Sequence, residues 1–517
     1  MNPVPPQSDR QSWGTYVRTA LLLLVTLAVA AATRLYGLGE LNYWFDESFS
    51  IRMSLFPVTE MFARCGEDTH PPLFFLLLKG WTMALGQVEW PTRLLSTLWS
   101  LGAVACAFGF TYEALWRADE RPSTESAALF AATIAGLAVA LSPLQISWAQ
   151  QVRMYAQVTC LTLMSTWLLW RAVERPGSGL RWLAFVLVEI AGLYTHVTML
   201  FVIAGHFLAL GAVIVLRCKA GVSTRLLAQR SAFAMSAVGL TGLPWILVIR
   251  AQHARVQDDF WIRPFNLDLL GEAFVKCFGV YQRPVPDPSL GLWLGQGMLI
   301  ILALVAAGRR SFDLLVALTA AMPFVLLIAV SLMSENIVNA RYFIAGHSLA
   351  CVAVAVLISR VPWWQLKVPV AASVLGILAY CTVDYHAWRE TAAQGAGIPG
   401  LLSTWRDHRV ANEPLVFSNP MFYTTGQIYS EVSDKMKIFG DEGDYPFFVG
   451  TAVTSHDEYL SADEIDAQAW NSIWVCDYGQ RERFLNPVQL SNSWQLVSET
   501  STKDYSGTFY LRRYDRR

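Results

Sequence analysis

The sequence predicts a polytopic α-helical membrane protein that carries a C-terminal mixed α/β domain. Composition supports this prediction first: of 517 residues, 54% are hydrophobic and 15% are charged, whereas soluble domains carry about 25% charged residues. Apolar runs of the kind that form spanning helices recur between residues 17 and 384. From Tyr385 onward the chain turns polar and contains short strand-like runs, which are typical of a separate folded domain.

About eleven membrane-spanning helices are expected from the apolar runs. The runs cover residues 17–37, 92–115, 127–143, 154–172, 181–196, 198–216, 231–250, 291–308, 311–333, 341–359 and 368–384. No signal-peptide cleavage site follows the first run, so we interpret it as a retained span.

The basic residues of the connecting loops predict the orientation. If the short apolar run 73–85 does not cross, these loops all face the side of Arg10 and Arg18, and the positive-inside bias makes that side cytoplasmic. The loops contain Arg117, Arg121, Arg171, Arg175, Arg181, Arg217, Lys219, Arg225, Arg230, Arg309, Arg310, Arg360 and Lys367. We therefore expect 73–85 to lie in the outer leaflet, within one external loop of residues 38–91.

The same loop has a second helical pattern. Apolar residues recur from Phe49 to Cys65 with an interruption at Pro57, which predicts two short amphipathic helices at the membrane interface. Two interpretations stay open: the helices roof a cavity, or they only cover the ends of the bundle.

The change in composition divides the chain into a transmembrane module, residues 1–384, and an extracytoplasmic α/β domain, residues 385–517. An odd number of spans puts the second part outside. A helix is expected around 398–412. Strands are expected at Leu415–Phe417, Ser472–Cys476 and Thr508–Leu511.

Charge and cysteines exclude several classes of protein. The formal net charge is −1, so no nucleic-acid partner is indicated. The cysteines include no Cys-x-x-Cys pair, which argues against a cysteine metal site. Cys65 and Cys277 fall in loops that we place outside, and a disulfide between them stays open because sequence does not test its geometry.

Polar residues gather on the external face. The first loop contains Trp44-Phe45-Asp46-Glu47 and Asp68-Thr69-His70-Pro71-Pro72-Leu73, and later turns contain Gln150–Tyr155, Tyr194–His196 and Asn339–Phe343. Ionisable groups beside a bilayer are costly, so they usually act on a substrate. The arginines lie on the side that normally lacks them, which indicates an external anion, and a phosphate suits a guanidinium.

These motifs resemble those of the GT-C superfamily of membrane glycosyltransferases, glycosyltransferase family 39-like, in the branch of protein O-mannosyltransferases and lipid A aminoarabinose transferases. The WFDE-type motif, the Asp-x-His-Pro-Pro segment, the Arg-Met-Tyr loop and the Arg-Tyr-Phe entrance carry the resemblance, which covers the first 200 residues best. It implies a GT-C fold, a polyprenyl-phosphate sugar donor, and inverting transfer on the non-cytoplasmic face.

Chemistry gives separate reasons for these residue types. Deprotonating an acceptor hydroxyl requires a carboxylate within hydrogen-bond reach, and the resemblance assigns this role to Asp46. Glu47 is expected to orient Asp46 or the acceptor. Arg153 and Arg341 are expected to stabilise charge on the leaving phosphate.

Four further residues have supporting roles in this hypothesis. Tyr155 and His196 are expected to donate hydrogen bonds near the phosphate. Asp68 and His70 complete the acceptor pocket or bind a divalent cation (Mg, Mn or Ca); the sequence leaves this open. Many relatives have an acidic residue where this chain has Gln151, which weakens the case for a metal.

Purely structural explanations compete with these roles. Asp46 would serve as an acidic N-cap of the following helix, and His70 would cap the helix that Pro71 and Pro72 start. Arg153 and Arg341 would snorkel to lipid headgroups. For His196 the alternative is a satisfied polar group in a helix turn.

Together these observations predict a hexosyl- or pentosyltransferase of the cell membrane, most simply a bacterial inner membrane. Its partners would be a polyprenyl-phosphate-linked sugar, membrane lipids and a hydroxyl acceptor on a protein, lipid or cell-envelope glycan. No glycine-rich phosphate loop for a nucleotide sugar is present. The alternative is a transporter or flippase of a lipid-linked or anionic substrate, although transporters tend to bind substrate at the membrane midplane between repeats.

Overall fold

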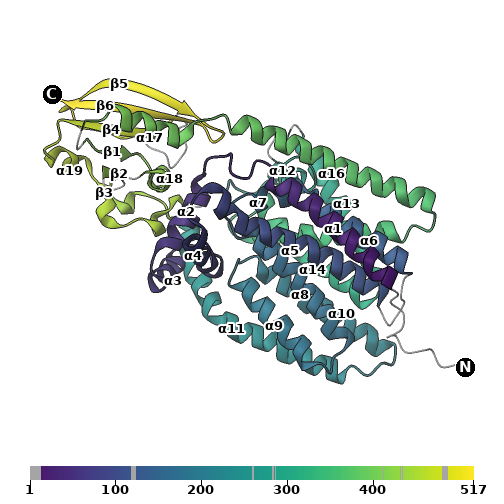
Figure 1. Cartoon of the computed structure of the whole chain (residues 1–517). Coiled ribbons are helices and arrows are strands. Elements are labelled where there is room, and N and C mark those ends of the chain that lie inside the picture. Colours follow the sequence, from purple (N-terminus) through teal and green to yellow (C-terminus); the bar gives the residue numbers. More distant parts are fainter. Residues whose placement is uncertain are drawn as a thin grey trace, which may run out of the picture.

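The computed structural model describes residues 13–117, 124–258, 261–281, 284–285, 287–410, 413–430, 432, 435–479 and 487–517. Arg10 and Arg121, which entered the orientation argument, lie outside the described residues. A long helical body has a mixed sheet domain at one end, and the long helix α16 (Trp364–Ala392) connects the two (Figure 1). The predicted fold class, a polytopic helical protein with a C-terminal α/β domain, is confirmed.

A helix overlies each predicted span. The helices are α1 (Trp13–Leu35), α5 (Glu89–Trp116), α6 (Glu125–Ala140), α8 (Tyr155–Glu174), α9 (Gly179–Leu193), α10 (Met199–Lys219), α11 (Arg225–Asp258), α13 (Pro288–Ala306), α14 (Ser311–Met333), α15 (Ile344–Ser359) and α16 (Trp364–Ala392). Among the described residues, 8 helices are long and apolar enough to cross a membrane, or up to 9 if one bent pair counts as a span. The chain is therefore a multi-pass membrane protein.

The first external loop forms three short helices. α2 (Phe45–Leu55) and α3 (Val58–Glu67) separate at Pro57, as the sequence predicts. α4 (Leu73–Leu85) has 13 residues, which corresponds to roughly 20 Å of helix against about 30 Å of hydrocarbon. It is therefore too short to span. α2 differs from an interfacial helix, because α4 and α18 (Pro420–Tyr429) of the sheet domain both pack on it and most of its residues are buried.

A sharp bend carries the chain from α6 to the site. α7 (Pro143–Ala149) follows α6 at an angle of 58°, and Ser142 accepts a hydrogen bond from its first turn. The bend frees carbonyl groups at the end of α6, and Arg34 donates to those of Val139 and Ala140 at 3.0 and 2.7 Å. Such a partner is needed because unpaired buried carbonyls are costly.

The C-terminal domain is a six-stranded mixed sheet of order β3-β2-β1-β4-β6-β5. β1, β2, β3 and β4 pair in parallel, and β6 pairs antiparallel with β4 and β5. The strands are β1 (Leu415–Phe417), β2 (Met436–Phe439), β3 (Tyr459–Leu460), β4 (Ser472–Tyr478), β5 (Trp494–Lys503) and β6 (Thr508–Arg516). The three predicted strands are confirmed as parts of β1, β4 and β6.

Helices cover both faces of this sheet. α17 (Gly397–His408), the predicted helix, shares one apolar core with α18 (Pro420–Tyr429), while α19 (Ala462–Ala467) buries Ile465 on the other face. β1 is buried throughout, as expected for an inner strand of a parallel sheet. α16 runs past residue 385 to Ala392, and the division of the chain at that residue stays a prediction.

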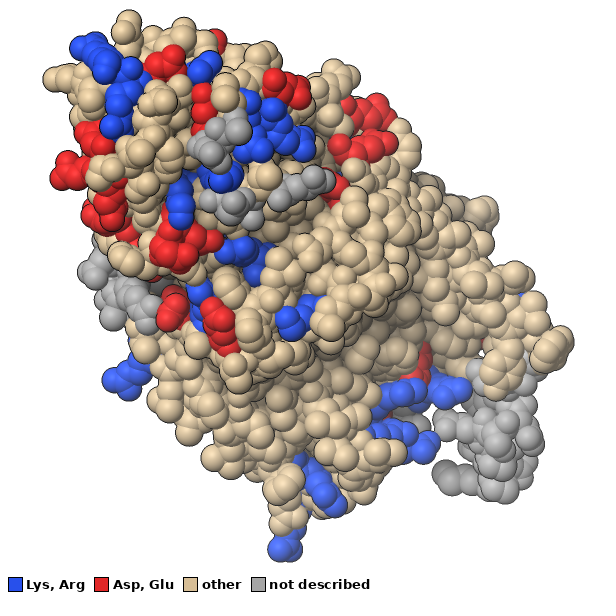
Figure 2. Space-filling view, turned by 60° about the vertical axis from the view of Figure 1, so that its left-hand side comes forward, with Lys and Arg blue, Asp and Glu red and all other residues tan. Residues whose placement is uncertain are grey.

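Surface charge differs between the two ends of the molecule. Acidic and basic side chains both gather on the sheet domain, the helical body is almost uncharged, and mainly Lys and Arg appear at the far end (Figure 2). This distribution agrees with the positive-inside bias. Cys65 and Cys277 are free, buried thiols, so the disulfide that the sequence left open is absent from the structure.

A buried ion pair attaches α2 to α5. Both carboxylate oxygens of Glu47 accept hydrogen bonds from Arg93 at 2.8 Å, and each side chain is 1% exposed. The backbone N–H of Val152 donates to the same carboxylate at 3.0 Å, and Arg93 also donates to the carbonyls of Leu38 and Leu41. The pair thus joins three separate segments at the start of α2.

We predict that Arg93→Ala destabilises the protein strongly, by about 3–5 kcal/mol, because it leaves the Glu47 carboxylate buried without a partner. Thermal unfolding in detergent micelles measures this. Glu60→Ala is the control: it removes an ion pair with Arg64 whose glutamate side chain is 42% exposed, and such pairs contribute about 0–1 kcal/mol. Equal unfolding temperatures for the two variants would contradict the prediction.

Candidate active site

Asp46 lies in the first turn of α2, directly after the N-cap residue Trp44 and Phe45. Because Trp44 is the N-cap residue, Asp46 does not cap α2, and a purely capping role does not explain it. Its Oδ2 lies 3.1 Å from Nη1 of Arg341 and 3.8 Å from Nε of Arg153. A carboxylate between two guanidinium groups is the centre of the site.

A chain of polar contacts extends from Arg153. Its Nη2 lies 2.8 Å from Nε2 of His70, whose Nδ1 lies 2.7 Å from Oδ2 of Asp68. Because arginine only donates, Nε2 of His70 accepts and Nδ1 carries the proton to Asp68. The N-cap residue of α4 is Pro72, which makes no side-chain hydrogen bond. His70 therefore does not cap α4, and its ring nitrogens contact Arg153 and Asp68 instead.

Burial and the neighbouring side chains shift the pKa of Asp68 in opposite directions. Burial by itself would raise the pKa of the Asp68 carboxyl, but the contact with His70, supported by Arg153, outweighs burial and lowers that pKa. Asp68 therefore stays ionised, and His70 is held in one orientation. This orientation presents its second ring nitrogen to Arg153.

Tyr155 and His196 lie behind the charged residues. The ring of Tyr155 is 4.3 Å from that of Trp148 and 5.1 Å from that of His196, and Nδ1 of His196 is 2.8 Å from the hydroxyl of Thr198. Burial lowers the pKa of His196 well below its ordinary value, and the nearby guanidinium groups of Arg153 and Arg341 act in the same direction. His196 is therefore a neutral residue that supports the site.

Asp46 faces a cavity of about 80 Å³. The sheet domain closes part of it with Phe447 and Phe448, so residues from both parts of the chain form the wall. Five of the predicted residues line it: Asp46, Asp68, His70, Arg153 and Arg341. Glu47, Tyr155 and His196 do not line this cavity.

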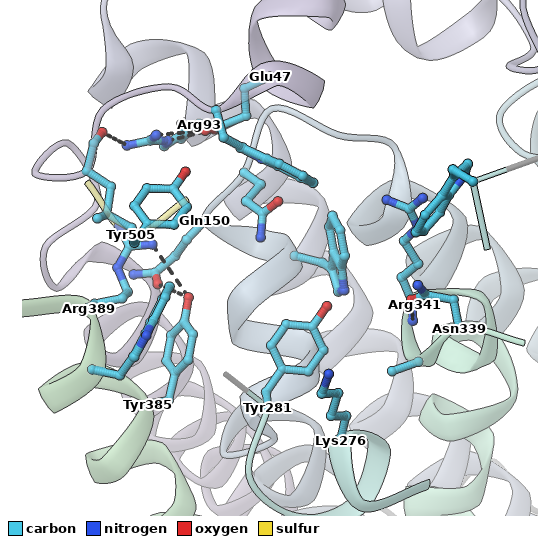
Figure 3. A pocket seen from close by; sticks show the side chains of 17 residues that line it. Glu47, Arg93, Gln150, Lys276, Tyr281, Asn339, Arg341, Tyr385, Arg389 and Tyr505 are labelled. Atoms are coloured by element: carbon cyan, nitrogen blue, oxygen red, sulfur yellow. Dashed lines mark hydrogen bonds and ion pairs between the residues drawn. The ribbon is translucent and has the colours of Figure 1, made fainter. Parts of the chain in front are cut away.

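A second cavity of about 310 Å³ lies beside the first, and Arg341 and Trp261 line both. Figure 3 shows Lys276 and Tyr281 between Arg341 on one side and Arg389 on the other. Several buried polar atoms near these cavities have no hydrogen-bond partner in the described part of the chain. They include Trp44 Nε1, Trp148 Nε1, Gln151 Oε1, Tyr155 Oη and Arg341 Nε. Such atoms are typical of a site that binds a polar ligand.

Sequence reasoning missed several residues of the larger cavity. Lys276 comes from α12 (Leu267–Phe278), an amphipathic helix whose start is capped by Asn266; a capping residue before an apolar helical pattern could have identified it. Tyr505 lies in the turn between β5 and β6 and reaches the cavity from the sheet domain. No local signal in the sequence identifies this tyrosine.

The acidic groups of the site do not fit a divalent cation. Asp46 already faces Arg341 and Arg153, and Asp68 is paired with His70. Among the residues that the structure describes, no group of three or more His, Cys, Asp or Glu side chains could hold a metal ion. Mg²⁺ and Ca²⁺ need several oxygen ligands, so we assign no step to a metal.

A segment of the sheet domain, residues 446–458, is attached to the first external loop; we call it the strap. Arg64 of α3 donates to the strap carbonyls of Ala452 and Thr454 at 3.0 and 2.9 Å. Val453 is fully buried in the same core as the site residues. The strap therefore holds Phe447 and Phe448 over Asp46.

No protein-family model and no curated protein matches the chain. Among solved structures, the chain is similar to ArnT from Cupriavidus metallidurans bound to undecaprenyl phosphate, with a TM-score of 0.57 and 13% identity over 97% of this chain and 98% of that chain. The apo state of the same protein gives a TM-score of 0.57 over 96% of this chain and 98% of that chain, again at 13% identity.

The oligosaccharyltransferase AglB from Archaeoglobus fulgidus, in complex with an inhibitory peptide and a dolichol-phosphate, matches with a TM-score of 0.48 and 10% identity over 90% of this chain and 70% of that chain. These neighbours are GT-C glycosyltransferases. The similarity to ArnT shows that the chain has the GT-C fold, and it confirms at the level of the fold the resemblance found in the sequence.

We predict that Gly450→Val loosens the strap. Gly450 has a φ of +99°, and a Cβ there would lie 2.9 Å from the ring of Phe45, so the cost is roughly 1–3 kcal/mol. Limited proteolysis should cut residues 446–458 faster than in the wild type. Gly443→Ala is the control because nothing lies within 4 Å of the added methyl group; equal proteolysis of the two variants would contradict the prediction.

Proposed function

We propose that the protein is an inverting glycosyltransferase that moves a hexosyl or pentosyl group from a polyprenyl-phosphate donor to a hydroxyl acceptor on the extracytoplasmic face of the membrane. One observation carries this proposal. The Asp46 carboxylate lies 3.1 Å from the Arg341 guanidinium, and Arg341 lines both cavities. A base and an anion-binding group thus stand side by side, as transfer from a phosphate ester requires.

In this mechanism the acceptor hydroxyl enters the smaller cavity and donates its hydrogen bond to Asp46. Asp46 takes the proton while the acceptor oxygen forms a bond to the anomeric carbon of the sugar. The bond from that carbon to the phosphate oxygen breaks on the opposite face, and its electron pair leaves with polyprenyl phosphate. Attack and departure on opposite faces invert the anomeric centre.

Arg341 and Arg153 stabilise the leaving group. Negative charge grows on the phosphate as the bond breaks, and fixed cations in a site with little water lower the barrier most. The guanidinium of Arg341 also lies 4.9 Å from the ring centroid of Trp261 and 5.1 Å from that of Tyr342. These aromatic contacts hold the cation in place without neutralising it.

Other charged residues act as positioning residues. Glu47 uses both oxygens to bind Arg93, so it fixes the start of α2 and thereby the direction of Asp46. Asp68 orients His70, which in turn contacts Arg153. Each of these contacts reduces the motion of a group that the reaction needs in one place.

Two observations support a lipid-linked donor on the extracytoplasmic side: the fold and the distribution of basic side chains. ArnT, the structure with the same fold, contains undecaprenyl phosphate. The site is lined by residues of both the helical body and the sheet domain, and mainly basic side chains appear at the far end of the helical body (Figure 2). The positive-inside bias supports an extracytoplasmic site.

We predict that Asp46→Asn abolishes turnover but keeps donor binding, because the amide retains the shape of the side chain and loses its basicity. Release of free polyprenyl phosphate from a polyprenyl-phosphate sugar measures turnover, and binding of the lipid is measured in parallel. Asp463→Asn, at an exposed position on α19, is the control and should behave like the wild type. Near-normal turnover of Asp46→Asn would show that another group is the base.

We predict that Arg341→Ala weakens binding of polyprenyl phosphate by about tenfold to a hundredfold, since a hydrogen bond to a charged group contributes about 1.5–3 kcal/mol. Arg341→Lys should recover part of the affinity, because it keeps the charge and loses the planar fork. Lipid affinity of the purified variants in nanodiscs is the measurement. Unchanged affinity of Arg341→Ala would remove this residue from the donor site.

A further inference from the structure

The larger cavity carries an excess of positive charge. Its lining residues include four cations and one carboxylate: Arg93, Lys276, Arg341, Arg389 and Glu47. Three of the cations have a carboxylate partner, in the pairs Arg93–Glu47, Lys276–Glu272 and Arg341–Asp46. Arg389 differs from them.

Arg389 is 5% exposed and has no carboxylate partner among the described residues. Its Nη2 donates to the carbonyl of Gly37 at 2.8 Å, and its Nη1 contacts the hydroxyl of Tyr385 at 3.5 Å. A guanidinium has five N–H donors, so most of its donor capacity is left for the cavity. A buried charge without a counterion costs several kcal/mol, which makes an anionic ligand the natural partner.

The surroundings of Arg389 are built and rigid. Tyr385 donates to Oε1 of Gln150 at 3.0 Å, and the amide nitrogen of Gln150 donates to two backbone carbonyls. Tyr505 lines the same end of the cavity (Figure 3). Burial, with the charge of Glu47 as a further cause, raises the pKa of Tyr505 well above its ordinary value, so its hydroxyl stays protonated.

Arg389 and Arg341 lie on opposite sides of the cavity (Figure 3). Under the proposed function, Arg341 binds the phosphate that links the lipid to the sugar. Lys276 and Tyr281 lie between the two arginines and separate Arg389 from a phosphate bound at Arg341 (Figure 3). The Arg389 side therefore needs an anion of its own.

We propose that Arg389 forms a second anion-binding site for a phosphate group, separate from the site at Arg341. This inference rests on the proposed function for the assignment of Arg341. The phosphate has two potential sources: the second phosphate of a diphosphate-linked donor, or an anionic group of the acceptor. Either source makes the substrate pair more anionic than a single lipid phosphate.

Radiolabelled inorganic phosphate is the probe, titrated into full-length protein in nanodiscs that is saturated with polyprenyl phosphate. The wild type should bind phosphate, Arg389→Gln should bind it at least about tenfold more weakly, and Arg389→Lys should retain most of the affinity. Arg406→Gln, on the exposed face of α17, is the matched control and should not change binding. The unfolding temperature of each variant is measured in parallel.

A second arm replaces polyprenyl phosphate with polyprenyl diphosphate. If the diphosphate displaces the labelled phosphate, the second phosphate belongs to the donor; if both bind together, the anionic group belongs to the acceptor. Absence of phosphate binding in the lipid-loaded wild type, or equal affinity in a folded Arg389→Gln variant, overturns the inference. If polyprenyl phosphate itself does not bind, the proposed function fails, and titration of the lipid-free protein still tests the Arg389 site.

Discussion

Glu47 and Arg93 form a bidentate ion pair from which solvent is excluded, and the position of the Asp46 carboxylate depends on it. The pair attaches the first turn of α2 to α5, while Val152 ties the same carboxylate to the segment after α7. Two charges without water hold a fixed geometry, because any displacement leaves a buried charge unpaired. Asp46, the next residue in the chain, is therefore presented to the cavity in one direction.

Electrostatic pairing also organises the rest of the site. Arg341 lies just before α15 and forms an ion pair with Asp46, which is 295 residues away in the chain. Arg153 lies between the same carboxylate and His70, which contacts Asp68. The carboxylates and cations are balanced in the smaller cavity, whereas cations exceed carboxylates in the larger one. This difference separates a space suited to a neutral hydroxyl from a space suited to anions.

The sheet domain is part of the site and not an appendage. Phe447 and Phe448 line the smaller cavity, and Tyr505 lines the larger one. Arginines of the first external loop hold the strap through backbone carbonyls and through Glu458. The carbonyl contacts are available whatever the side chain, whereas the contact with Arg52 requires an acidic residue at position 458.

The sequence by itself determined the class of fold, because hydrophobic length and period are local properties. The apolar runs located the spans, Pro57 located the break between α2 and α3, and the run Leu415–Phe417 located β1. The motif residues Asp46, His70, Arg153 and Arg341 were identified in the same way, because their residue types and loop positions are visible in the chain. The placement of these loops on one face followed from the order of the spans.

Only the tertiary structure decided which charges meet. It paired Glu47 with Arg93, placed His196 and Tyr155 behind the charged residues, and brought Lys276, Arg389 and Tyr505 to one cavity. These contacts join segments that lie far apart in the chain, 46 residues for Glu47 and Arg93, and their energies depend on distance and burial, which no local pattern encodes. The helical body and the sheet domain had to meet before a site existed between them.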